Sequence, residues 1–198
     1  MEILSLVILG LVQGLTEFLP VSSSGHLVLL GSVFGIEDNL FVSLILHLAT
    51  LFAVVVCLRK EIWQLLRHPF SNLAIKLYVA TIPTCLIVLV IMPLISTAFS
   101  GGGLAVCFLI SAIILFCADI LSKQKQCSEG VSIKQAIIMG IGQGFAAMPG
   151  ISRSGTTISA GLIAGGNKEQ TAKFSFLMSI PIILMSLLLE IYKIVAFE

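Results

Sequence analysis

One arginine stands alone in a long stretch of the chain that has no other charged residue. Arg153 lies within PGISRSGTT, residues 149–157, and residues 135–167 contain no second charge. An arginine at the centre of a bilayer costs about 2.5–3.5 kcal/mol or more, so a charge in such surroundings is functional by default. Its planar guanidinium suits phosphate oxygens, and glycine-rich turns before helices add backbone N–H donors. Three hydroxyl groups close to it can bind the same anion: those of Ser152, Ser154 and Thr157.

A second polar turn lies near the N-terminus, in PVSSSGH, residues 20–26. Glu17, just before this turn, is the obvious countercharge for Arg153, and it can also act as a base or bind a metal. His26 can carry a proton or attack phosphorus, and a serine hydroxyl can act as a nucleophile. These groups together predict phosphoryl transfer to water on an anionic substrate that resides in the membrane. The other polar residues of this region are Gln13, Ser22, Ser23 and Ser24.

Each of these residues also has a structural interpretation. Glu17 and Arg153 could form an ion pair that holds helices together, although the hydroxyl clusters would then be unexplained. Residues 22–24 could cap a helix, which is compatible with ligand binding at the same place. His26 could be a hydrogen-bonded interior histidine. His47 lies in the middle of an apolar segment, and we interpret it as a helix-packing hydrogen-bonding residue.

Composition indicates an all-α integral membrane protein. Of the 198 residues, 58% are hydrophobic and 11% are charged, whereas soluble domains have about a quarter of charged residues. The net charge of +1 offers no basic excess for nucleic acid, so we expect no nucleic-acid partner. A helix needs about 20 apolar residues to cross a bilayer. About four segments meet that requirement: residues 40–58, 73–95, 104–121 and 171–197.

Two further segments are apolar but are broken by polar residues, glycines and a proline. Residues 3–19 are followed by a short apolar piece at 27–36, and residues 135–148 are followed by one at 158–164. The second piece of each pair is too short to span. We predict two re-entrant helical hairpins, whose backbone must be satisfied by protein or by a wet cavity.

The two hairpins form an internal repeat. An offset of 130 positions aligns GLVQGLTEFLPVSSSG, residues 10–25, with GIGQGFAAMPGISRSG, residues 140–155, without a gap. Basic residues follow two of the predicted spans, which places those connections in the cytoplasm. The first hairpin then enters from the outer face and the second from the inner face. We therefore predict a single membrane domain of inverted repeats, with repeat one at about 1–121 and an incomplete repeat two at about 131–198. Such architectures bind anions near the midplane, where the helix ends meet.

The motifs of the two turns resemble those of a known family, the bacterial undecaprenyl-diphosphate phosphatases associated with bacitracin resistance. QGLTE, residues 13–17, fits the family's Glu/Gln-x-x-x-Glu pattern, and FLPVSSSGH, residues 18–26, fits its serine-rich turn. PGISRSGTT and FSFLMSIP, residues 174–181, match two further family segments. The resemblance covers essentially the whole chain, except that the family usually continues with two more C-terminal membrane spans.

The resemblance implies a hydrolase in the bacterial cytoplasmic membrane. It would convert undecaprenyl diphosphate to undecaprenyl phosphate and inorganic phosphate, recycle the lipid carrier of cell-wall precursors, and confer bacitracin resistance. Its active site would open to the outer face and would use Mg²⁺ or Ca²⁺. The implied catalytic residues are Glu17, which would also bind the metal, and His26, Arg153 and Ser23. The implied substrate-binding residues are Gln13, Ser22, Ser24, Ser152, Ser154 and Thr157.

Alternatives remain open at this point. The attacking group could be a serine, His26, or water activated by Glu17. A homodimer could close the gap that the two absent spans would leave, and membrane lipids would be further partners. A prenyl-phosphate transporter, or flippase, would use the same midplane anion site, although a carboxylate beside the ligand favours the enzyme. A purely structural membrane protein would leave the polar clusters without a reason.

Overall fold

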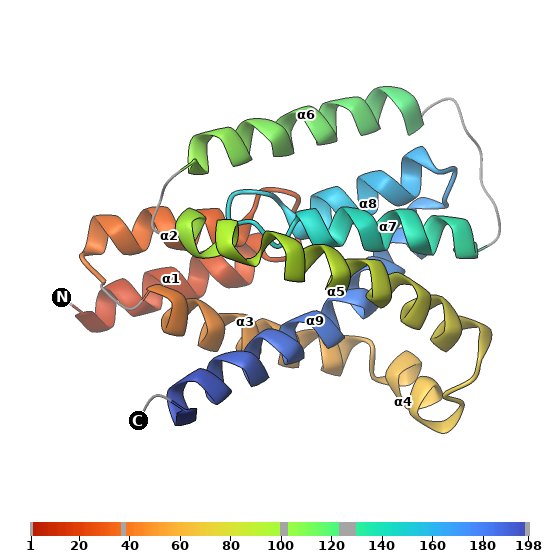
Figure 1. Ribbon diagram of the computed structural model, residues 1–198, viewed down its shortest axis with the longest axis horizontal. Coiled ribbons are helices and arrows are strands. Elements are labelled where there is room, and N and C mark those ends of the chain that lie inside the picture. The colour runs from red at the N-terminus through yellow and green to blue at the C-terminus, as the bar shows by residue number, and fades with distance from the viewer. Residues whose placement is uncertain (1, 37–38, 100–102, 123–129, 197–198) are drawn as a thin grey trace.

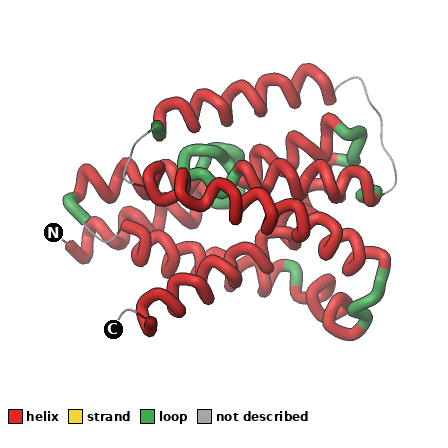
Figure 2. The backbone as a smooth tube through the Cα atoms, viewed as in Figure 1, coloured by secondary structure: helices red, strands yellow, loops and turns green. Residues whose placement is uncertain are grey.

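The computed structural model describes residues 2–36, 39–99, 103–122 and 130–196, and these residues are almost entirely helical (Figure 2). No strand occurs within these ranges, which confirms the all-α prediction. The helices are α1 (Glu2–Thr16), α2 (Ser23–Phe34), α3 (Asn39–Cys57), α4 (Arg59–Arg67), α5 (Asn72–Phe99), α6 (Leu104–Ser122), α7 (Ile133–Phe145), α8 (Arg153–Ile163) and α9 (Lys168–Ala196).

Helical hairpins occupy both positions at which the sequence predicts them. The α1–α2 pair and the α7–α8 pair run in from opposite ends of the molecule, and their turns meet near its middle (Figure 1). The short second helices begin at Ser23 and Arg153, so both N-termini lie at this meeting point. A helix N-terminus carries a partial positive charge, and two of them at one place favour an anion there.

The contacts between the two turns are reciprocal, as the internal repeat requires. A Cβ added to Gly25 would lie 2.9 Å from the Cα of Gly150, and one added to Gly155 would lie 3.1 Å from the Cβ of Pro20. Position 25 corresponds to 155, and position 20 to 150, under the offset of 130. The same pair of contacts is thus made twice in opposite directions. This reciprocity supports the predicted inverted arrangement.

Serine caps start both of the short helices. The Ser22 hydroxyl accepts a hydrogen bond from the Gly25 backbone N–H at 3.4 Å, and the equivalent Ser152 hydroxyl accepts one from Gly155 at 3.1 Å. These bonds satisfy donors that a helix N-terminus otherwise leaves open. Ser22 has a φ of 61°, an unusual backbone conformation for a residue other than glycine. Ser22 and Ser152 are therefore structural residues at the site, in addition to the binding role expected for them.

Three long apolar helices within the described residues can cross a bilayer: Asn72–Ile95 of α5, Leu104–Ser122, and Lys168–Leu188 of α9. The fourth predicted span corresponds to α3, which continues into α4 after a bend of 79°. The short helix α4 carries Arg59, Lys60, Glu61 and Arg67, and none of its residues is buried. Charged, exposed helices of this kind lie at a membrane surface rather than within it. The described residues thus contain three spans by length and composition, or four if the bent α3–α4 pair forms one.

The second hairpin is held by α5 and α6. Helix α3 packs against the first hairpin, α9 packs against α8, and α3 and α9 pack against each other. A Cβ on Gly140 of α7 would lie only 2.1 Å from the carbonyl oxygen of Ala80 of α5. The two helices can approach this closely because Gly140 has no side chain. One helical turn after Ala80, the Thr84 hydroxyl donates to the Gly140 carbonyl oxygen at 2.8 Å. This packing fixes the position of α7 and of the turn that follows it.

Candidate active site

Glu17 lies at the start of the first turn, one residue after the end of α1. Its side chain is 6% exposed. One helical turn earlier, the buried Gln13 side chain donates from Nε2 to Glu17 Oε2 at 2.9 Å. The same nitrogen donates to Thr50 Oγ1 on α3 at 3.3 Å. The spacing of four residues places both side chains on one face of α1, so the helix itself positions the carboxylate.

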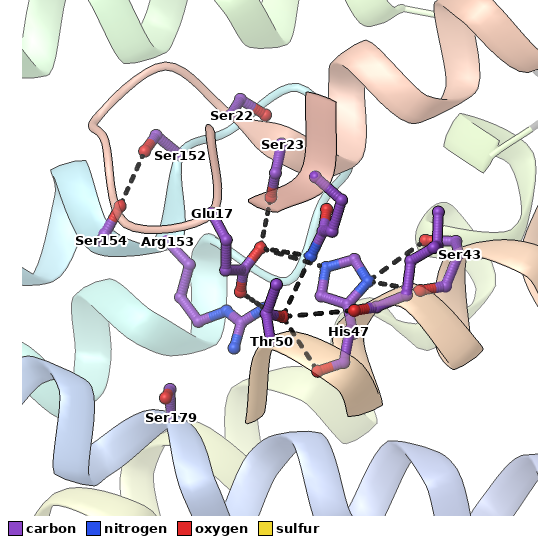
Figure 3. Close-up of polar contacts among 12 residues, drawn as sticks. Glu17, Ser22, Ser23, Ser43, His47, Thr50, Ser152, Arg153, Ser154 and Ser179 are labelled. Carbon is purple, nitrogen blue, oxygen red and sulfur yellow. Dashed lines mark hydrogen bonds and ion pairs between the residues drawn. The ribbon is translucent and has the colours of Figure 1, made fainter. Parts of the chain in front are cut away.

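The second helix of each hairpin sends one further donor to this carboxylate. Ser23 Oγ donates to Oε2 of Glu17 at 2.5 Å, and Arg153 Nη2 donates to Oε1 at 3.2 Å. Ser23 and Arg153 occupy equivalent positions in the internal repeat, and both are the first residues of their helices. Figure 3 shows the carboxylate between them. The tertiary structure therefore brings together residues that are 136 positions apart in the sequence.

A fourth contact to the carboxylate comes from α3. His47 Nε2 lies 3.5 Å from Glu17 Oε2, and His47 Nδ1 lies 2.6 Å from the carbonyl oxygen of Ser43 (Figure 3). Our interpretation of His47 as a helix-packing residue was incomplete. Its hydrogen bond to Ser43 is within α3, as that interpretation suggests, but its other nitrogen faces the site.

The second turn is built by hydrogen bonds of its own. Ser154 Oγ donates to the Leu19 carbonyl oxygen at 3.1 Å and so ties the second turn to the first. The Ser152 backbone N–H donates to Ser111 Oγ of α6 at 2.8 Å. Thr157 is fully buried, and its hydroxyl lies 2.6 Å from Ser175 Oγ of α9. These contacts fix the backbone segment that carries Arg153.

A cavity of about 1630 Å³ adjoins the carboxylate. Its polar end includes Glu17, Ser23 and Arg153, and the rest of its wall is mostly apolar. The polar wall is continued by Ser22, Ser24, Ser43, His47, Ser152, Ser154, Ser175 and Ser179. The apolar wall includes Val28, Leu29, Leu44, Val88, Leu89, Met92, Phe176 and Ile182. An anionic head at one end and a long hydrocarbon chain at the other would match such a cavity.

Arg153 has donors left over after its contact with Glu17. Its Nη1 atom is buried and has no hydrogen-bond partner in the described part of the chain. Gln13 Oε1 is likewise buried and unpaired. Buried polar groups nearly always have a partner, so unpaired ones indicate an absent ligand, ion or water. The site therefore has unused donor and acceptor capacity on both sides of Glu17.

Of the predicted site residues, most converge and two lie apart. Gln13, His26 and Thr157 are not among the described residues that line the cavity, but Gln13 is joined to the site by its hydrogen bond to Glu17. His26 Nδ1 lies 2.8 Å from the Ser22 carbonyl oxygen, and its ring packs edge-on against Phe108 of α6. The structure thus places His26 as a packing residue behind the serine turn, and a catalytic role for it stays a prediction. The predicted residues that do converge are Gln13, Glu17, Ser22, Ser23, Ser24, Ser152, Arg153 and Ser154.

A divalent cation fits this donor set only together with a substrate. No group of three or more His, Cys, Asp or Glu side chains occurs within the ranges that the structure describes. Mg²⁺, however, is commonly bound by one or two carboxylates plus substrate phosphates. Glu17, the Ser23 hydroxyl and the unpaired Gln13 Oε1 are oxygen donors of the required kind. The site is compatible with a cation shared between Glu17 and phosphate oxygens.

Sequence reasoning missed several residues that the fold brings to the site. They are Ser43 and Thr50 of α3 and Ser175 and Ser179 of α9, in addition to His47. A signal existed for His47, because an ionisable residue in a predicted span is a functional candidate by default. Small hydroxyl residues are frequent in membrane helices and carry no such signal. Their position became evident with the packing of α3 and α9 around the turns.

Fold and site together define a class of protein: a multi-pass membrane protein in which two opposed helical hairpins present a buried carboxylate and a guanidinium to an apolar cavity. The family model described as Bacitracin resistance protein BacA matches residues 6–198. The chain belongs to this family.

Individual relatives agree with the family match. A protein called undecaprenyl-diphosphatase in Carboxydothermus hydrogenoformans is 44% identical over 191 residues, which cover 96% of this chain and 73% of that protein. One with the same name in Parabacteroides distasonis is 42% identical, covering 97% of this chain and 76% of the relative. Another in Methanococcus maripaludis is 40% identical, covering 95% and 78%. The chain thus spans about three quarters of the length of these relatives.

Proposed function

We propose that this chain is an undecaprenyl-diphosphate phosphatase that hydrolyses undecaprenyl diphosphate to undecaprenyl phosphate and inorganic phosphate. One observation carries the proposal: Glu17 accepts hydrogen bonds from Ser23 at 2.5 Å and from Arg153 at 3.2 Å, at the polar end of an apolar cavity. A potential nucleophile, a base and an anion-binding group thus meet at one point. The names of the relatives point to the same activity.

The diphosphate would be bound by Arg153 and by the ends of two helices. Nη1 of Arg153 is buried and unpaired, and it can donate to phosphate while Nη2 remains on Glu17. The N-termini of α2 and α8 both point to this place, where their partial positive charges attract phosphate oxygens. The prenyl tail would occupy the apolar part of the cavity between α2, α5 and α9.

The geometry favours Ser23 as the attacking group and Glu17 as its base. Ser23 Oγ already directs its proton at Oε2 of Glu17. In the first step, Oγ would bond to the terminal phosphorus, the bond from that phosphorus to the bridging oxygen would break, and undecaprenyl phosphate would leave. Water would then cleave the phosphoserine, release inorganic phosphate and restore the Ser23 hydroxyl, with Glu17 accepting and returning the proton in turn.

A divalent cation, Mg²⁺ or Ca²⁺, is part of the proposal. Glu17 and the phosphate oxygens would hold it, with Gln13 Oε1 as a neighbouring oxygen donor. When bound, it would neutralise negative charge on the diphosphate. Arg153 would share that task, because phosphoryl transfer is catalysed mainly by positioning and by charge stabilisation.

We further propose that the protein resides in the bacterial cytoplasmic membrane with its site open to the outer face. Arg59, Lys60 and Arg67 of α4 would lie on the cytoplasmic side. Hydrolysis there would return the lipid carrier to cell-wall synthesis and would confer resistance to bacitracin. A homodimer in the membrane is the oligomeric state that we propose to examine first.

A transporter of prenyl phosphates is the second candidate function. Two opposed hairpins that meet around a half-buried arginine are also typical of secondary carriers. The short Ser23–Glu17 hydrogen bond favours the enzyme, because a carrier of anionic headgroups has no use for a base aimed at a hydroxyl.

Phosphate release from undecaprenyl or farnesyl diphosphate by the purified protein in detergent tests the proposal. We expect release with Mg²⁺ or Ca²⁺, little release with EDTA, and a collapse of release in Arg153→Ala, Glu17→Ala and Ser23→Ala. Arg67→Ala and Glu169→Ala are matched controls, because both residues are exposed and lie outside the cavity. Folded wild-type protein that binds prenyl diphosphate through Arg153 and releases no phosphate would favour the transporter.

A further inference from the structure

Helix α3 contributes two side chains to the surroundings of Glu17 from the side opposite the second hairpin. His47 and Thr50 are three residues apart and therefore share one face of the helix. His47 Nε2 lies 3.5 Å from Glu17 Oε2, and Thr50 Oγ1 accepts the second hydrogen bond of Gln13 Nε2 at 3.3 Å. The His47 contact ends at the oxygen that also accepts the Ser23 hydrogen bond, and Thr50 acts on the same oxygen through Gln13.

The orientation of the His47 ring follows from its contact within α3. A carbonyl oxygen can only accept, so the 2.6 Å contact to the Ser43 carbonyl places a hydrogen on His47 Nδ1. This bond fixes the ring and directs Nε2 toward Glu17. Nε2 can donate to the carboxylate when it also carries a hydrogen, that is, when the ring is an imidazolium paired with Glu17. In many protein sites a hydrogen bond to one ring nitrogen of a histidine fixes the ring, while the other ring nitrogen faces a functional group.

Glu17 needs such support because its two oxygens have different tasks. Arg153 binds Oε1, while Oε2 must stay aimed at Ser23 Oγ. Ser23 and Gln13 hold Oε2, and a further contact from α3 adds to their resistance against the pull of the guanidinium on Oε1. Gln13 alone is a neutral donor and is itself held by Thr50.

We propose that His47 is a positioning residue for Glu17: through Nε2 it keeps Oε2 directed at Ser23 Oγ in the geometry needed for proton transfer. This inference rests on the proposed phosphatase function. It gives α3 a part in catalysis, although α3 lies outside both hairpins. It does not require His47 to touch the substrate.

Glutamine and asparagine substitutions separate this role from a purely structural one. In His47→Gln the amide nitrogen can reach the place of Nε2, whereas in His47→Asn it reaches only the place of Nδ1. Both variants keep a polar group in α3. We expect kcat close to wild type in His47→Gln and a loss of about 10–100-fold in His47→Asn, with KM changed little in both. The same pair of substitutions at His68, an exposed residue that follows α4, is the control and should leave kcat unchanged.

An infrared measurement gives a readout that does not depend on turnover. The carboxylate stretching band of Glu17 is assigned by its loss in Glu17→Gln. We expect this band to shift in His47→Asn and to stay in place in His47→Gln. His47→Ser serves as a second short variant if His47→Asn does not fold.

The outcomes are distinguishable. Equal kcat values in the glutamine and short variants would overturn the role of His47, and so would a loss confined to KM. If the wild-type protein releases no phosphate, the proposed function is refuted. The infrared band of Glu17 then tests by itself whether His47 positions the carboxylate. A band that stays in place in every His47 variant overturns the inference; a band that shifts in the short variant alone supports it.

Discussion

Replacement of Gly25 by alanine tests whether the two hairpin turns must touch for the site to form. The added Cβ would lie 2.9 Å from Gly150 Cα, 3.1 Å from Gly150 N and 2.7 Å from Phe108 Cζ. The phenylalanine ring can move aside, but the backbone of Gly150 belongs to the second turn. Carbon atoms pack best at about 3.5–4.0 Å, so the turns would have to separate by roughly 0.6–1.1 Å.

The expected size of the effect follows from that displacement. Overpacking of this kind costs about 1–3 kcal/mol of unfolding free energy. The Arg153–Glu17 contact is 3.2 Å long and bridges the same two turns, so the added separation would lengthen it beyond hydrogen-bonding distance. A misplacement of about 1 Å at a catalytic site can cost roughly 100-fold in rate. We therefore expect Gly25→Ala to lower both stability and kcat.

Gly14→Ala is the matched control for this substitution. No atom lies within 4 Å of the position that a Cβ would take on Gly14, which is inside α1. The same chemical change should there stabilise the helix by about 0.5–1 kcal/mol, because glycine is a poor helix former. Thermal unfolding and phosphate release in one detergent give both quantities. Wild-type stability and rate in Gly25→Ala would refute the tight contact between the turns.

Four further predictions address the site and its supports. Arg153→Lys should lower kcat/KM by about 100-fold or more, because an ammonium cannot replace the two-nitrogen fork that serves Glu17 and phosphate together. Ser111→Ala leaves the buried Ser152 N–H without its acceptor at 2.8 Å and should cost about 1–3 kcal/mol, measured by thermal unfolding. The hydrogen bond from Lys173 lowers the pKa of the Glu61 carboxyl, so the stability contributed by this pair is present above the ordinary glutamate pKa and is lost as pH falls through the lowered value. Removal of divalent cations by EDTA should abolish phosphate release, and Mg²⁺ or Ca²⁺ should restore it.

Each of these predictions has a clear contrary result. Full activity of Arg153→Lys would mean that a point charge is sufficient. Unchanged stability of Ser111→Ala would mean that the second turn is not tied to α6. In Lys173→Ala the unfolding midpoint should lose part of its dependence on pH in the acid range, and an unaltered profile would contradict the role of the pair. Full phosphate release in EDTA would exclude a required cation.

Much of the site was predictable because its residues are local in the sequence. Gln13 and Glu17 are one helical turn apart, and the serines that cap α2 and α8 are in the turn motifs themselves. Arg153 was identifiable because no other charge occurs near it. Its pairing with Glu17 was predictable as well, since a buried cation needs an anion and Glu17 was the obvious candidate.

Two histidines show what sequence position leaves open, because their surroundings depend on which way a side chain faces. His26 follows directly after the serine turn, yet its ring packs on Phe108 behind that turn. His47 lies in an apolar span, yet Nε2 faces Glu17. Successive residues of a helix point in directions that differ by about 100°. In a helix with apolar residues all around, sequence position alone does not decide which residue faces the site.

The sequence alone determined the all-helical membrane character, the two hairpins with their internal repeat, and the acid, hydroxyl and guanidinium groups of the turns. Hydrophobicity, helix capping and isolated charges are local properties, so they can be read from neighbouring residues. The tertiary structure decided that Ser23 and Arg153 bind different oxygens of Glu17, that α3 supplies His47 and Thr50, and that α9 supplies serines to the cavity wall. These features depend on how the helices pack and rotate against one another, which is set by close contacts such as that of Gly140 with Ala80 rather than by any local pattern.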